Sequence, residues 1–99
     1  MKKLKLKSMY AILIQLTINP QFASEAATTF TNSILPKVKS APGFIAGYWV
    51  DPVNDEGFGF ILFENADQAK SVLPPTIDWA APGVIINKFD MRRVAVSIP

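Results

Sequence analysis

Two apolar segments joined by a short polar loop are the feature that most constrains the fold of this 99-residue chain. Residues 43–50 and 58–63 flank seven residues rich in turn formers, which predicts a β-hairpin. Both faces of both strands are apolar. One helix before the hairpin and one after it can cover only one face of a sheet, so something outside the chain must cover the other. The pattern therefore predicts a dimer.

The composition excludes several kinds of chemistry. The chain has no Cys, which excludes disulfides, thiolate nucleophiles and cysteine-ligated metals. It also has no His, the commonest general base and a frequent metal or haem ligand. A net charge of +2 is too small to indicate a nucleic-acid partner. We therefore expect no metal site, no cofactor and no binding of nucleic acid.

The N-terminal segment can be interpreted in two ways. Residues 1–8 are basic and precede a short apolar run, as in a secretory signal peptide. The apolar residues of that run share one parity, as a long strand requires, and the run leads directly into a helix-start signal. We favour the strand, and expect a cytoplasmic protein without a membrane-spanning segment or a membrane partner. Residues 1–8 are then a basic extension or the start of the first strand, and residues 9–99 form a single domain.

The expected elements follow from periodicity and from breaker residues. Strands are expected over residues 10–18, 44–50, 58–64 and 88–98, with a brief strand over 84–86 left open, and helices over 20–35 and 66–73. Asn19 and Asn65 are suited to cap the two helices, the second with Gln68 in a capping box. Pro36 should end or kink the first helix near Leu35, because proline lacks the N–H that a helix interior uses.

The order βαββαβ with antiparallel pairing predicts an α+β, ferredoxin-like sandwich: a four-stranded sheet with both helices on one face. Strands 10–18 and 58–64 should be central, since they are the most uniformly apolar. Asp90, Arg92 and Arg93 make the last strand suitable for an edge, where charge discourages further pairing. Two such sheets packed face to face would enclose a barrel-like interior. Replacing Ile61 or Phe63 by Asp, whichever faces the second sheet, should then dissociate or precipitate the protein.

Three passages give the chain a family resemblance, and together they extend over roughly residues 8–98. They are residues 35–49, containing Ala-Pro-Gly-Phe-Ile-Ala-Gly-Tyr-Trp, residues 60–69, and residues 82–97. The chain resembles the dimeric α-β barrel superfamily, and within it the antibiotic-biosynthesis-monooxygenase-like domains. The resemblance implies a homodimer formed through the open sheet face and a pocket for a small ligand. The superfamily includes monooxygenases, haem-degrading enzymes and proteins of no known activity.

The departures from this resemblance concern haem. Haem-degrading members have a His after the second helix, an Asn in the first strand and a Trp at the end of the third strand. The chain has no His, and it has Ile14 or Gln15 and then Phe63 at the other two positions. The resemblance therefore does not imply haem degradation. A monooxygenase that works without a cofactor needs neither His nor metal and remains compatible with the composition.

The candidate site residues are mostly aromatic. Tyr48 and Trp49 are adjacent, so in a strand one should face the helices and the other the dimer cavity. Trp49, Phe63 and Trp79 are the candidates for binding a flat ligand, with packing as the alternative role and, for Trp79, a lid or a loop anchor. The polar candidates for catalysis are Arg92, Asn87 and Tyr48. Arg92 would stabilise an anionic oxygen if it faced inward, or pair with Asp90 at an exposed edge.

Two smaller groups of residues complete the expectations. Gly47 and Gly59 lie inside strands, where glycine marks a bulge or a close approach that keeps room for a ligand. Asp51, Asp55 and Glu56 lack the spacing of a calcium loop and are expected to be a solvated turn. We expect non-catalytic binding of a small apolar or aromatic ligand, and the alternative is a cofactor-independent monooxygenase acting on a small aromatic substrate.

Overall fold

The computed structural model describes residues 9–98, so the predicted basic extension, residues 1–8, lies outside the described residues. The strands are β1 (Tyr10–Ile18), β2 (Phe44–Val53), β3 (Glu56–Phe63) and β4 (Val84–Arg93), and the helices are α2 (Ala23–Thr29), α3 (Leu35–Lys39) and α4 (Ala66–Lys70). A 3₁₀ turn, Pro20–Phe22, precedes α2, and a π-helical segment, Phe30–Ile34, joins α2 to α3.

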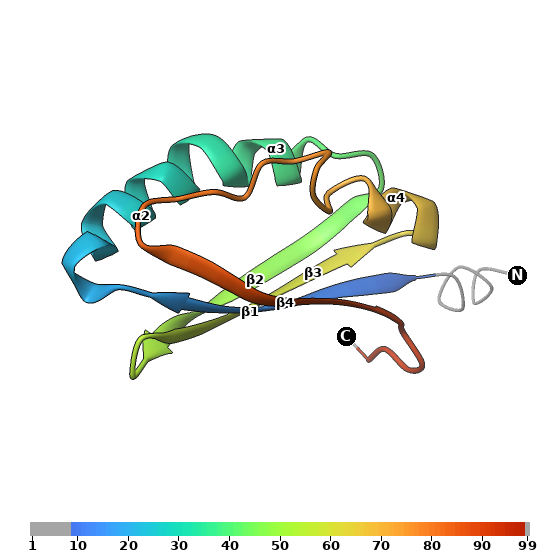
Figure 1. The fold of residues 1–99 in the computed structure, drawn as a ribbon. Helices are drawn as coiled ribbons and strands as arrows, with labels where there is room; N and C mark the ends of the chain where they lie inside the picture. The colour runs from blue at the N-terminus through green and yellow to red at the C-terminus, as the bar shows by residue number, and fades with distance from the viewer. Residues whose placement is uncertain (1–8, 99) are drawn as a thin grey trace, which may run out of the picture.

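The four strands form one antiparallel sheet in the order β2-β3-β1-β4. The predicted ferredoxin-like fold is confirmed, with β1 and β3 central and β4 at an edge. Figure 1 shows the helices on one face of the sheet and the opposite face uncovered. The loop after α4 runs back along α3 and α2 before it enters β4, and its end is fixed where Asn19 N–H donates to Gly83 O at 2.7 Å.

The hydrophobic core lies between the helices and the two central strands. Ile12 and Ile14 of β1 and Ile61 and Phe63 of β3 are all essentially inaccessible to solvent, and Val38 of α3 packs against them. The expectation that Ile61 or Phe63 faces a second sheet is therefore wrong. These side chains share the parity that points toward the helices, and the other parity of β3 points to the open face.

The first helix passes through Pro36, which was expected to end or kink it. The preceding segment is π-helical, and Leu35 N–H donates to Phe30 O, five residues back. In this register the chain re-forms a helix at Leu35, with Pro36 in the first turn of α3, where its missing N–H costs no intrahelical bond. The helical layer consequently extends to Lys39 and covers the length of the sheet.

Both predicted helix caps are present. The Asn19 side chain accepts a hydrogen bond from Gln21 N at 3.0 Å, and the Asn65 side chain accepts one from Gln68 N at 2.9 Å. The helix that Asn65 caps ends at Lys70, three residues before its predicted end.

The predicted seven-residue hairpin loop is wrong, because β2 and β3 continue to a two-residue turn. Asn54 and Asp55 both have positive φ, 52° and 66°, as a type I′ hairpin turn requires. The last strand also differs from its predicted span of 88–98. It begins at Val84 and ends at Arg93, so the brief strand predicted over 84–86 is its first part.

The burial of the core predicts that truncating two isoleucines of the sheet, Ile61 on β3 and Ile85 on β4, will lower the free energy of unfolding by very different amounts. Ile61→Ala should lower the free energy of unfolding by about 2–5 kcal/mol, because it opens a cavity in a fully packed core. Ile85→Ala is the matched control: Ile85 is 65% exposed and should lose about 1 kcal/mol or less. Urea unfolding measures both, and equal losses would contradict the assignment of Ile61 to the core.

A candidate ligand-binding cavity between helices and sheet

A cavity of about 380 Å³ lies between the sheet and the helical segment formed by α2 and the π-helical residues that follow it. Its helix side is formed by three alanines and Phe30, and its sheet side includes Leu16, Trp49 and Ile86. The alanines are Ala23, Ala26 and Ala27. They recur with the i, i+3, i+4 spacing that places side chains on one face of a helix. A helix face of methyl groups cannot fill the space above the sheet, and this leaves the cavity open.

The Trp49 indole lies flat on the sheet, over two glycines. A Cβ built on Gly59 would be 2.5 Å from Trp49 Nε1, and one on Gly47 would be 2.7 Å from its Cζ3 atom. Gly59 is the cross-strand partner of Trp49, and Gly47 lies two residues before it on the same face. From the helix side, Phe30 contacts the indole edge-to-face, with the ring centroids 5.1 Å apart. The glycines therefore keep room for the tryptophan itself.

The two tryptophans at the cavity differ in their hydrogen bonding. Trp79 is 6% exposed, and its Nε1 donates to Val72 O at 2.7 Å, which anchors the loop between α4 and β4. Trp49 Nε1 is also buried, but it has no hydrogen-bond partner among the described residues. An unsatisfied buried donor costs about 1–3 kcal/mol, which an acceptor on a ligand would recover.

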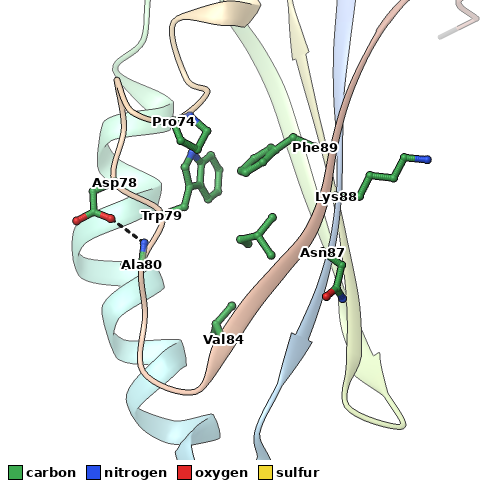
Figure 2. Close-up of a pocket in the computed structure, with 9 residues that line it drawn as sticks. Pro74, Asp78, Trp79, Ala80, Val84, Asn87, Lys88 and Phe89 are labelled. Atoms are coloured by element: carbon green, nitrogen blue, oxygen red, sulfur yellow. Dashed lines mark hydrogen bonds between the residues drawn. The ribbon is translucent and has the colours of Figure 1, made fainter.

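A second hollow lies outside this cavity, between the loop and β4, and has a volume of about 490 Å³. Figure 2 shows Trp79 and Phe89 facing each other across it, with ring centroids 5.4 Å apart. Asn87 and Lys88 lie on its β4 side and point away from the two rings. Trp79 lines both hollows, so its indole separates the inner cavity from the outer groove.

The polar side chains considered for catalysis do not meet at the cavity. Tyr48 is 66% exposed on the open face of the sheet. Asn87 lies in the outer groove, and its side chain donates to Thr17 Oγ1 at 2.8 Å. Arg92 forms an ion pair with Asp90, with Nη2 and Oδ2 2.7 Å apart. The Arg92 hydrogen bond holds the pKa of the Asp90 carboxyl below its ordinary value, and neither residue lines the cavity.

The aromatic candidates are distributed differently. Trp49 and Trp79 both line the inner cavity, whereas Phe63 lies in the packed core beside Phe44, with ring centroids 6.1 Å apart. Residues 9–98 contain no cluster of three or more acidic side chains that could hold a metal ion. The described helices include none that is long and apolar enough to cross a membrane.

The comparisons with known proteins identify the fold. No family model matches this sequence, and no curated protein matches it. Solved structures do match the fold of this chain, and each match covers almost the whole of both chains. SnoaB, a cofactor-independent oxygenase from Streptomyces nogalater, has a TM-score of 0.69 at 11% identity, with 93% of this chain and 98% of that chain covered.

Two further solved structures have the same architecture. The heme-degrading protein Rv3592 from Mycobacterium tuberculosis matches with a TM-score of 0.67 at 13% identity, covering 92% of this chain and 99% of that chain. NE2512, a protein of unknown function from Nitrosomonas europaea, matches with 0.65 at 15% identity, covering 94% and 96%. The chain therefore has the same fold as these three proteins. Since they include an oxygenase, a heme-degrading protein and a protein of unknown function, the fold assigns no particular reaction.

The glycine platform predicts a position-specific cost. Gly59→Ala should destabilise the protein by about 1–3 kcal/mol, because its Cβ displaces a rigid indole that Phe30 holds from above. Near-ultraviolet circular dichroism should change as Trp49 moves. Gly57→Ala, on the same face of β3, is the matched control: its Cβ would be 3.1 Å from the flexible end of Leu16. A smaller cost for Gly59→Ala than for Gly57→Ala would refute the platform.

Proposed function

We propose that this protein binds a small, flat, apolar or aromatic ligand in the cavity between α2 and the sheet, and that it does so without catalysis. The observation that carries this proposal is Trp49: it lines an apolar cavity, and its buried Nε1 lacks a hydrogen-bond partner among the described residues. Natural ligand sites combine mostly apolar walls with a few polar groups that orient the ligand. The cavity has this character.

The size of the cavity limits the ligand. A cavity of about 150 Å³ suffices for benzene, so the 380 Å³ found here accommodates a bicyclic aromatic compound. Phe30 and Trp49 supply aromatic surface on one side of the cavity and Trp79 on another. Aromatic rings pair favourably with such surfaces in stacked or edge-to-face arrangements.

The absence of converging polar groups favours binding over turnover. General acid–base catalysis needs a titratable group within hydrogen-bond reach of the reacting atom. Arg92, Asn87 and Tyr48 lie on the open face or at the outer groove, where a ligand in the inner cavity does not contact them. Apart from Trp49 Nε1, the polar side chain among the lining residues is that of Asp51, which is exposed and is not joined there by a second polar side chain.

The second candidate is a cofactor-independent oxygenase acting on a small aromatic substrate. Its support is the fold shared with SnoaB, together with an aromatic cavity that could exclude water around a substrate. Oxygen uptake in the presence of a panel of naphthols and polycyclic phenols decides between the two functions. Uptake that depends on protein and substrate would establish the oxygenase, whereas saturable binding without uptake supports the proposed binding protein.

We also propose that the protein is a homodimer formed through the open face of the sheet. The exposed hydrophobic side chains on that face come from three adjacent strands: Leu13, Tyr48, Val50, Phe58 and Phe60. A contiguous apolar surface of this kind is unusual on a monomer and typical of an interaction site. A second copy offers the same surface, and a two-fold axis makes it self-complementary.

Ligand binding should depend on the indole N–H of Trp49. Trp49→Phe keeps an aromatic ring but removes the pyrrole ring with its N–H donor, so it should weaken binding of an acceptor-bearing ligand such as naphthol by about two- to tenfold. Isothermal titration calorimetry measures the affinity, and thermal unfolding should show stabilisation by the ligand in the native protein. The control, Tyr48→Phe, removes a hydroxyl from the open face and should leave the affinity unchanged.

The proposed dimer should depend on the open face alone. Phe60→Asp should give monomers at micromolar concentration in sedimentation equilibrium, because it introduces a charge into the apolar surface. Asn32→Asp introduces a carboxylate on an exposed position of the helical layer and should leave the dimer intact. A native protein that sediments as a monomer would rule out the proposed dimer.

A further inference from the structure

The charges around the inner cavity restrict the ligand further than its shape does. Asp51 is the one charged residue among the described residues that line this cavity. It lies two residues after Trp49 on β2, where the register between β2 and β3 shifts and the strand no longer alternates between buried and exposed residues. Asp51 lines the cavity and is exposed, so it lies at the edge of the cavity, where one end of a bound ligand would meet it.

The carboxylate of Asp51 has no cationic partner in the described structure. The ion pairs formed by residues 9–98 join Lys88 and Arg92 to Asp90 on β4. These groups belong to the opposite edge of the sheet from β2. The other carboxylates near this end of the molecule, Asp55 and Glu56 on the same hairpin and Glu25 on α2, carry the same sign as Asp51.

We propose, on the basis of the binding function above, that the natural ligand is a flat aromatic compound that carries both a hydrogen-bond acceptor and an amine, with its ring and acceptor at Trp49 and its ammonium group beside Asp51. The cavity supplies an apolar wall for the ring and a single negative charge for the head group. An aromatic carboxylate of the same size would place like charges together and would leave Trp49 as its only source of a polar contact. Asp51 then selects the charge of the head group at one end of the ligand, and Trp49 selects the flat shape of the ring at the other.

Three probes with the same hydroxynaphthalene ring system, and so the same acceptor for Trp49 Nε1, test this proposal: the aminomethyl, hydroxymethyl and carboxyl derivatives of one naphthol. With the native protein, calorimetry should show affinities in the order amine, alcohol, carboxylate. Each step should amount to about two- to fivefold, since the ion pair is exposed to solvent. Raising the salt concentration should compress the differences, because screening weakens an exposed charge pair.

Asp51→Asn should abolish the preference for the amine over the alcohol. Asp55→Asn is the matched control: it removes the same charge from the same hairpin, at the turn, where Asn tolerates the positive φ. Asp55 does not line the cavity, so this variant should keep the full preference.

The outcomes separate this proposal from the binding function on which it rests. If all three probes bind equally, or if Asp51→Asn retains the order, the amine assignment is overturned and the binding function stands. If the carboxylate binds best, the assignment is likewise overturned. If none of the probes binds to the native protein, the binding function itself fails, and the amine assignment fails with it.

Discussion

One layer of helices covers only one face of a four-stranded sheet, and most features of this protein follow from that constraint. The helix-facing parity of β1 and β3 supplies the packed core, with Ile12, Ile61 and Phe63 fully buried. The other parity carries Phe58 and Phe60 and remains uncovered in the chain alone. The same division separates the apolar cavity under the helices from the exposed apolar surface on the other side of the sheet.

The cavity exists because several side chains in one region are small. The three alanines of α2 provide space above the sheet, and Gly47 and Gly59 let Trp49 lie below it. A residue with a Cβ at either glycine would push the indole upward and reduce that space. The two tryptophans then have different roles. Trp79 fixes the loop through its bond to Val72, whereas Trp49 retains an unused donor.

The sequence was sufficient for the topology and for the elements whose signals are local. β1 has the predicted bounds, and Asn19 and Asn65 cap helices as their positions indicate. Whether the first helix continues past Pro36 could not be decided from the sequence, because the π-helical register before this residue depends on how the helix fits the sheet, which no local pattern encodes. The two-residue turn was missed because Asn54 and Asp55 are common in loops of any length.

The face occupied by Ile61 and Phe63 could not be predicted for a more general reason. Where both faces of a strand are apolar, period-two alternation carries no information on which parity faces the helices. Of the aromatic residues predicted to bind a ligand, Trp49 and Trp79 line the cavity and Phe63 does not. Asp51 also lines it, although the sequence was interpreted there only as a solvated turn. The in-strand glycines were the signal for the close approach, although the group that approaches is Trp49.

The alanine face of α2 has a consequence for how such a protein can change. The volume of the cavity is determined on the helix, by Ala23, Ala26 and Ala27, whereas its charge is determined on β2, by Asp51. Of these four residues only Ala26 is buried, and the other three are exposed. In the proposed site, the size of the ligand and its charge would therefore be selected by residues on different elements, so each could change by single substitutions while the sheet and its open face stay the same.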